Sequence, residues 1–306
     1  YKANTTVLKM VSMSYHFKLL SHPNKLLYDH LKAVGDLSRK FVKEKLIEHV
    51  EHLSEVSYLI GISHDFGKAN EMFQRKIKEN YKTGKADHSM ISGIWTYFVI
   101  KNYISAKNIK IDNLNLPIIS YLVVSRHHSD LRDISGTTGE IQSLKDEKDH
   151  LIEQIREIRK NQEEIKNIYL SLCEGYIDIC NIDEFFNNFE NKIENLINEL
   201  YRLSESNCDI YCYLTLLFLY SILLDADKVD ASNTPLPKRI DIPPTLVDEF
   251  IKSKFSNNKN KIDIERDKIY HKVVSFSENF DPTKNKRFVI ELPTGSGKTL
   301  ISLSLA

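Results

Sequence analysis

The sequence predicts a mainly α-helical protein that is followed by the start of an α/β unit. Over most of the chain, apolar residues recur at three- and four-residue steps, which is the spacing of one buried helix face. The clearest example is the series Leu27, Leu31, Val34, Leu37 and Phe41. After Asp230 this pattern stops, and a polar, proline-containing segment precedes a strand, a glycine-rich loop and a helix.

The composition is that of a globular protein. The 306 residues suffice for one large domain or two smaller ones, and 42% hydrophobic with 27% charged residues allows a sizeable core. The 42 Lys and Arg residues equal the 42 Asp and Glu residues, so a nucleic-acid contact requires a local basic patch. Because no secretory signal is visible, we expect a cytoplasmic protein with reduced thiols.

Four further segments are apolar enough to form buried helices. Residues 53–69 keep the helical pattern until Gly67, and Pro117 suits the first turn of the helix expected at 116–128. Residues 90–104 form another apolar segment. The longest apolar run, 211–224, is shorter than the roughly 20 residues that span a bilayer. We therefore expect it to be a buried core helix and expect no membrane partner.

Residues 140–205 have a different pattern, with an apolar residue at every seventh position and charges between. The seam consists of Leu144, Leu151, Ile158, Ile165 and Leu172. This spacing predicts a long amphipathic helix, which could pair with residues 185–203 as an antiparallel coiled coil. We expect a surface helical insertion, and an arm that docks a partner is the alternative.

Cysteine usage favours buried thiols over a zinc site. The four cysteines are Cys173, Cys180, Cys208 and Cys212. Cys208 and Cys212 are four residues apart and could share a helix face, but the closely spaced C-x₂-C pairs of structural zinc sites are absent from the sequence.

Histidines and aspartates in separate helical segments form the candidate site. His30 lies on an apolar face, His64 follows Ile60 by one turn, and Asp227 continues the stripe of the most apolar helix. Each residue alone is more often a hydrogen-bonded core residue. The larger set is His30, His64, Asp65, His88, His127, His128 and Asp227. Several imidazoles and carboxylates converging in one core favour bound metal, because an inward carboxylate is costly unless it is paired or binds a cation.

The order of these residues resembles the HD nuclease domain of the type I CRISPR-associated nuclease-helicase. The motifs are His30, "HDFGK", "DHSMIS", "RHHSDL" and "DADKVD", and "GKANEMFQ" is similar to the family's continuation after the His-Asp pair. The resemblance covers about residues 16–230, with 140–205 poorly matched. It implies an HD-type helical domain over residues 1–231 with an insertion at about 140–205.

The resemblance also implies two divalent ions, which could be Mn, Co, Ni, Fe or Mg. The first ion would be held by His30, His64, Asp65 and Asp227. The second would be held by Asp65, His88, His127 and His128, with Asp65 as the bridge. Asp225 competes with Asp227 for the last position.

Two such ions can lower the pKa of a bound water and aim it at phosphorus. Lys68 could stabilise the phosphate, although an exposed loop lysine is an equal alternative. Arg126, Arg132 and Lys76 could contact further phosphates.

The function that follows is a metal-dependent nuclease that degrades single-stranded DNA, since a duplex would not easily enter a helical core. In the family, an RNA-guided CRISPR surveillance complex recruits the nuclease, and a helicase unwinds the target. One alternative is an HD phosphohydrolase acting on nucleotides or cyclic nucleotides. Another is a degenerate HD domain that serves as a docking module.

The segment "ELPTGSGKTL" resembles motif I of superfamily-2 helicases. It departs from the general phosphate-loop pattern because Leu292 stands at the first glycine position. A strand is expected at residues 287–292 and a helix after the loop. The backbone around Gly295, Gly297 and Lys298 would bind ATP phosphates, and Thr299 would hold Mg²⁺.

We place a linker at 232–260 and the truncated start of a helicase domain at 261–306. Because the sequence starts at Tyr1 and stops within an apolar helical run, we expect a piece of a longer protein, and the acidic ATPase motif does not follow the loop. We expect this piece alone not to hydrolyse ATP, whereas the full-length protein would.

Overall fold

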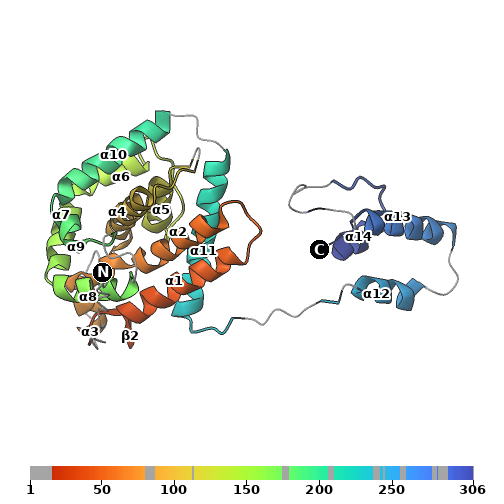
Figure 1. The fold of residues 1–306 in the computed structure, drawn as a ribbon, viewed down its shortest axis with the longest axis horizontal. Coiled ribbons are helices and arrows are strands. Elements are labelled where there is room, and N and C mark those ends of the chain that lie inside the picture. The colour runs from red at the N-terminus through yellow and green to blue at the C-terminus, as the bar shows by residue number, and fades with distance from the viewer. Residues whose placement is uncertain are drawn as a thin grey trace, which may run out of the picture. The chain divides into compact units, whose positions relative to one another are not determined.

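The computed structural model confirms a mainly α-helical chain (Figure 1). It describes residues 16–79, 87–111, 114–173, 179–205, 210–236, 242–243, 245–255, 260–277, 281 and 289–305. Within these residues the only strands are β1 (Leu20–His22) and β2 (Lys25–Leu26), which pair as a small antiparallel hairpin. The chain divides into two compact units, Tyr1–Leu236 and Pro237–Ala306.

Five apolar helices build the core of the first unit. They are α1 (Leu27–Lys43), α2 (Val50–Ser63), α4 (Ser89–Lys107), α5 (Leu116–Ser125) and α11 (Ile210–Ala231). Helix α1 packs along α2, α4 packs along α5, and α11 contacts α1, α2 and α5. Leu31, Val34, Ile94, Trp95 and Tyr121 are fully buried between them. The apolar faces predicted from the sequence are therefore the faces that meet in this core.

A close approach of α1 and α2 depends on two glycines. A Cβ on Gly61 would lie 2.7 Å from the Cα of Gly35 and 2.9 Å from the carbonyl oxygen of Val34. Only a residue without a side chain allows the two backbones to touch at this point. The contact fixes α2 against α1, and these two helices carry the first histidines of the candidate site.

Residues 140–205 form several packed helices, and the expected single long helix is wrong. The helices are α6 (Glu140–Asp146), α7 (Lys148–Arg159), α8 (Gln162–Leu172), α9 (Ile182–Phe186) and α10 (Phe189–Glu205). The heptad seam is buried as predicted, but it packs around one side of α4 and α5 (Figure 1). At the break between α7 and α8, the Nδ2 of Asn161 donates to the carbonyl oxygen of Ala69 at 2.9 Å. The segment is therefore part of the core.

Helix α11 is only partly a core helix. It has 22 residues and is long and apolar enough to cross a membrane by length and composition, with 28% of its most apolar window buried. The expectation of a buried helix is wrong for its first turns, where Ile210, Tyr211 and Leu214 are exposed. Its second half is buried at Leu223 and Ala226 and carries Asp227 into the candidate site.

The second unit contains α12 (Leu246–Phe255), α13 (Lys261–Ser277) and α14 (Lys298–Leu305). Helix α12 lies within residues 232–260, where we expected a linker. The strand expected at 287–292 is not formed in its described part, and Val289 is 83% exposed. A parallel strand requires neighbouring strands, and the described residues of this unit contain none.

Candidate metal centre

A buried cluster lies where the five core helices meet, and it contains all seven predicted metal ligands. His30 comes from α1, His64 and Asp65 follow α2, and His88 precedes α4. His127 and His128 follow α5, and Asp227 lies on α11. His30, His64, Asp65 and His127 are each at most 4% exposed. The fold therefore brings together residues that are up to about two hundred positions apart in the chain.

Asp65 is the centre of the cluster, because each of its oxygens faces two imidazoles. Its Oδ1 lies 2.9 Å from Nε2 of His88 and 3.6 Å from Nε2 of His127. Its Oδ2 lies 3.0 Å from Nε2 of His30 and 3.4 Å from Nε2 of His64. A carboxylate placed between two pairs of imidazoles in this way could bridge two metal ions.

The ligand atoms fall into two groups that share Asp65. In one group the candidate atoms of His30, His64 and Asp65 lie within 4.8 Å of one another. In the other, those of Asp65, His88, His127 and His128 do so. The Oδ1 of Asp227 joins the first group, 3.3 Å from Nε2 of His30 and 3.6 Å from Nε2 of His64.

The competing aspartate points elsewhere. Asp225 is exposed, whereas the side chain of Asp227 is 16% exposed and faces the histidines. The two residues are two positions apart on a helix, so they lie on different faces. Asp227 is the residue that the geometry places in the cluster.

Hydrogen bonds on the far side of three rings fix their orientation. Nδ1 of His64 donates to the carbonyl oxygen of Gly61 at 2.7 Å, and Nδ1 of His127 donates to that of Val124 at 2.6 Å. Nδ1 of His30 lies 2.5 Å from Oδ2 of Asp230. Because a carbonyl oxygen only accepts, the hydrogen sits on Nδ1, and Nε2 points into the cluster. Metal-binding histidines are held in this way.

The inward atoms lack hydrogen-bond partners. Among the described residues, Nε2 of His30, His64 and His127 and both oxygens of Asp65 are buried without a well-formed hydrogen bond, although Nζ of Lys68 forms an ion pair with Oδ2 of Asp65. Where an imidazole is neutral, its lone pair beside a carboxylate oxygen is repulsive, and an unsatisfied buried polar group costs about 1–3 kcal/mol. A cation between these atoms removes the repulsion. Imidazole nitrogens with carboxylate oxygens suit divalent transition metals, so the donor set fits such ions.

The histidines of the cluster differ in the direction of their pKa shifts. Burial lowers the pKa of His30, but the adjacent carboxylates of Asp227, Asp230 and Asp65 outweigh burial and raise that pKa to about 10. Burial, with His127 and His88 nearby, lowers the pKa of His128 to about 3. Burial likewise lowers the pKa of His88. The rings of His88 and His128 are therefore neutral and keep a lone pair for a metal ion.

The carboxylates stay ionised despite their burial. Burial raises the pKa of Asp65, but the charges of His64 and Lys68 hold it well below its ordinary value of 3.8. Burial also raises the pKa of Asp227, but the adjacent imidazoles of His30 and His64 lower it below the same ordinary value. Both carboxylates therefore carry the negative charge that a divalent ion needs.

Lys68 is a buried residue of the site and not an exposed loop lysine. It lies on the short 3₁₀ helix η1 (Phe66–Ala69), is 5% exposed, and its Nζ lies 2.6 Å from Oδ2 of Asp65. The preceding Gly67 lets this turn approach α4, since a Cβ there would lie 2.6 Å from the carbonyl oxygen of His88. The "HDFGK" motif is thus one tight turn that places three polar groups together.

Four residues near the cluster were missed from the sequence. Asp230 accepts from His30 and lies 2.6 Å from Nζ of Lys25, which anchors the hairpin. The ring centroid of His22 lies 4.9 Å from that of His30. Gln74 on α3 (Glu71–Glu79) donates to the carbonyl oxygens of Lys68 and Leu20. Asp230 had a signal, because it lies three positions after Asp227 and so shares its helix face.

The three basic residues expected to contact phosphate differ in their surroundings. Arg126 is 6% exposed, and its Nε forms an ion pair with Glu140. Arg132 and Lys76 are exposed. Cys173 and Cys180 are buried free thiols, and Cys212 is buried. Cys208 lies outside the described residues, and so does the predicted pairing of Cys208 and Cys212 on one helix face.

The glycine-rich loop is a separate candidate site within the second unit. Gly295 and Gly297 have φ values of +84° and +88°, which side chains rarely adopt. Nε of Arg266 donates to the carbonyl oxygen of Gly295 at 2.7 Å, and Nζ of Lys298 donates to that of Leu292 at 3.0 Å. The loop and α14 border a cavity of about 390 Å³, and Thr299 lines it.

No protein-family model matches this chain, and no curated protein matches it significantly.

Proposed function

We propose that this chain is a metal-dependent nuclease of the HD type that cuts single-stranded DNA with two divalent ions. The observation that supports it best is the shared position of Asp65 between two groups of inward, unpartnered imidazole nitrogens. A structural histidine cluster would satisfy these atoms with hydrogen bonds. The resemblance of the motifs to the CRISPR-associated nuclease-helicase supports the same reaction.

The chain's own residues would hold the ions and neutralise charge. When bound, two divalent ions supply a water of lowered pKa and stabilise the phosphoryl oxygens. Asp65 would bind both, and Asp230, Gly61 and Val124 keep three imidazoles turned toward them. Lys68 would exchange part of its contact with Asp65 for a phosphate oxygen, since its ammonium group is already at the centre.

The wider role belongs to the same proposal. We propose an RNA-guided CRISPR surveillance complex as the partner that supplies single-stranded DNA. We also propose that Gly295, Gly297, Lys298 and Thr299 bind ATP phosphates in the full-length protein. The positive φ values of the two glycines support this, because successive backbone N–H groups in such a loop form an anion nest.

One experiment separates the candidate functions. The purified protein is incubated with circular single-stranded DNA and with nucleotides or cyclic nucleotides, in Mn²⁺, Co²⁺, Ni²⁺ or Mg²⁺. Linearisation of the circle is the expected result, since the circle offers no end to an exonuclease. If the protein hydrolyses only nucleotides, the phosphohydrolase alternative is supported instead of the nuclease. If it is inactive with every metal, the docking-module alternative is supported.

A further inference from the structure

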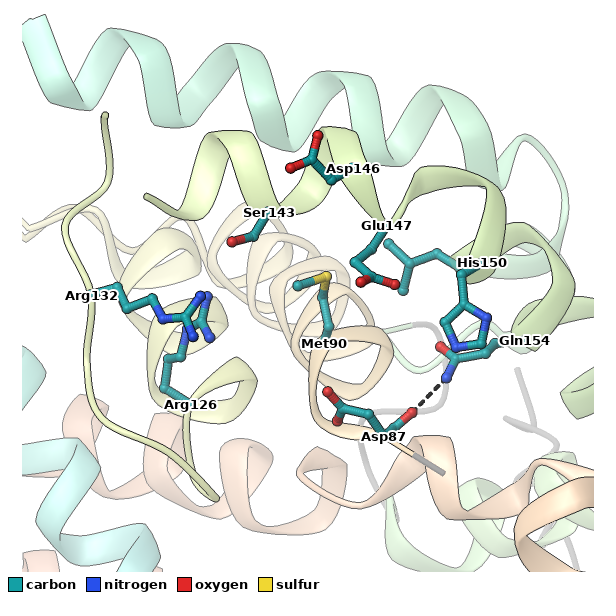
Figure 2. Close-up of a pocket in the computed structure, with 10 residues that line it drawn as sticks. Asp87, Met90, Arg126, Arg132, Ser143, Asp146, Glu147, His150 and Gln154 are labelled. Carbon is teal, nitrogen blue, oxygen red and sulfur yellow. Dashed lines mark hydrogen bonds between the residues drawn. The ribbon is translucent and has the colours of Figure 1, made fainter. Parts of the chain in front are cut away.

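A cavity of about 490 Å³ lies beside the metal centre, between α4, the end of α5, and helices α6 and α7 of the insertion (Figure 2). Among its lining residues are Met90, Arg126, Arg132, Glu147, His150 and Gln154. Its volume is in the range of sites for small ligands. Neither the metal ligands nor the glycine-rich loop uses it.

One end of the cavity is cationic and has an unsatisfied donor. Arg126 and Arg132 lie at this end in Figure 2. Nε of Arg126 is paired with Glu140, which also accepts from the hydroxyl of Tyr121, but Nη2 of Arg126 is buried without a hydrogen-bond partner among the residues that the structure describes. Glu140 neutralises only one of the two guanidinium groups, so the arginine end keeps a positive charge and a free donor for an anion, while the carboxylates of Asp87, Asp146 and Glu147 line other parts of the cavity. A phosphate group fits, since guanidinium groups bind its oxygens with charge-assisted hydrogen bonds.

The other end of the cavity suits a flat group with a polar edge. Met90 and Leu151 supply apolar surface, and His150 and Gln154 lie at the end opposite the arginines (Figure 2). Nε2 of His150 is buried without a hydrogen-bond partner in the described residues. Glu147 adds a carboxylate that can accept from an amino group. A phosphate at one end and a base at the other are the two parts of a nucleotide.

The cavity is connected to the metal centre through neighbouring residues. Arg126 directly precedes His127, and Asp87 of the cavity directly precedes His88, so each pair is about 3.8 Å apart along the backbone. The Nε2 of Gln154 donates to the carbonyl oxygen of Asp87 at 2.5 Å, which fixes α7 to the start of α4 (Figure 2). Beyond this contact a smaller hollow of about 40 Å³ is lined by Gly67 and His88.

We propose that this cavity binds one nucleotide of the strand whose neighbouring phosphodiester lies at the metal centre. Its phosphate contacts Arg126 and Arg132, and its base lies between Met90 and the polar groups of α7. The adjacency to His88 and His127 favours a nucleotide of the strand over a free nucleotide. The assignment to a strand rests on the proposed nuclease function. It gives helices α6 and α7 the role of holding the substrate.

The test measures binding without catalysis. A fluorescein-labelled single-stranded oligodeoxynucleotide is titrated into the protein, without added metal, and deoxyadenosine monophosphate serves as competitor. Arg132→Ala should weaken both ligands about tenfold, the size of one charge-assisted contact. Arg126→Lys keeps a charge for Glu140 but removes the fork of the guanidinium, and it should weaken both as well. Arg156→Ala, an exposed arginine on the same α7, is the matched control and should bind normally.

Two results would overturn the assignment. Equal affinities for Arg132→Ala and Arg156→Ala would show that the cavity takes no nucleotide. If Arg132→Ala loses affinity for the mononucleotide but binds the oligonucleotide normally, the cavity is a site for free nucleotides and does not hold a nucleotide of the strand.

Cleavage kinetics keep this test separate from the nuclease proposal. Arg132→Ala should raise KM for the oligonucleotide about tenfold and should change KM for bis(p-nitrophenyl) phosphate much less, because this small diester has no nucleotide for the cavity, whereas Arg156→Ala should change neither. An equal loss with both compounds in Arg132→Ala would contradict the assignment. If neither the wild type nor any variant cleaves either compound, the nuclease proposal fails. The binding results still decide whether the cavity binds a nucleotide.

Discussion

The two candidate sites of this chain are built in opposite ways. In the first unit, Asp65 is 1% exposed, and its neighbours come from five helices that pack against one another. In the second, the loop from Thr294 to Gly297 is formed by consecutive residues, and Lys298 and Thr299 are exposed. A site assembled from distant residues depends on the whole fold, whereas a local loop depends mainly on its own backbone. Substitutions should therefore have large effects at the first site and local effects at the second.

The largest effect is expected from the two aspartates of α11. Asp227→Ala should lower cleavage of single-stranded DNA by about a thousandfold, because losing a ligand removes several kcal/mol of transition-state stabilisation. Asp225→Ala, two positions away and exposed, should cleave normally. Initial rates with Mn²⁺ provide the measurement. Equal losses in both variants would mean that the helix, and not the ligand, was affected.

The next effect contrasts two glycines. Gly67→Ala forces a Cβ to within 2.6 Å of the carbonyl oxygen of His88, so it should cost about 1–3 kcal/mol and lower metal affinity. Gly295→Ala has only one atom within 4 Å, Nη2 of Arg266 at 3.9 Å, and its cost is the positive φ, about 1–2 kcal/mol. Urea unfolding and metal titration of both variants would check this. Normal metal binding by Gly67→Ala would contradict the role of this turn in placing the polar groups of the metal centre.

A smaller effect is expected from Asp230, which accepts a hydrogen bond from Nδ1 of His30 on the side of the ring that faces away from the cluster. Asp230→Asn should weaken metal binding about 10–100-fold, because His30 loses the carboxylate that fixes its tautomer. Calorimetric titration with Mn²⁺ would measure the change. Asp183→Asn, an exposed acidic residue of the insertion, should leave the affinity unchanged.

The smallest effect is the pH dependence of the metal-free protein. The pKa of His30 is raised from 6.5 to about 10, so its contribution to stability is full below pH 6.5 and is lost as pH rises toward 10. The pKa values of Asp65 and Asp227 are lowered from 3.8, so their contribution is present above about pH 4 and is lost on further acidification. The melting temperature should therefore fall on both sides of the range between pH 4 and 6.5. A curve that stays flat up to pH 10 would contradict the assignment of His30.

The sequence predicted the candidate site better than the fold. The seven ligand positions came from the resemblance of the motifs to the HD nuclease domain, and the structure brings these residues together. Asp230 and Lys25 were missed because their role depends on a contact between α11 and the hairpin, which are far apart in sequence. Periodicity predicted the buried seam of 140–205 but not the break at Asn161, which forms because that side chain bonds to Ala69. The strand at 287–292 was wrong because strand propensity requires partner strands.

Metal content tests the central claim, the bridging position of Asp65, most directly. The protein is loaded with Mn²⁺, desalted and analysed for bound metal, together with Asp65→Ala and Asp225→Ala. We expect about two ions per chain in the wild type and in Asp225→Ala, and fewer than one in Asp65→Ala, because each ion loses a ligand. Two ions retained by Asp65→Ala, or none bound by the wild type, would contradict the account.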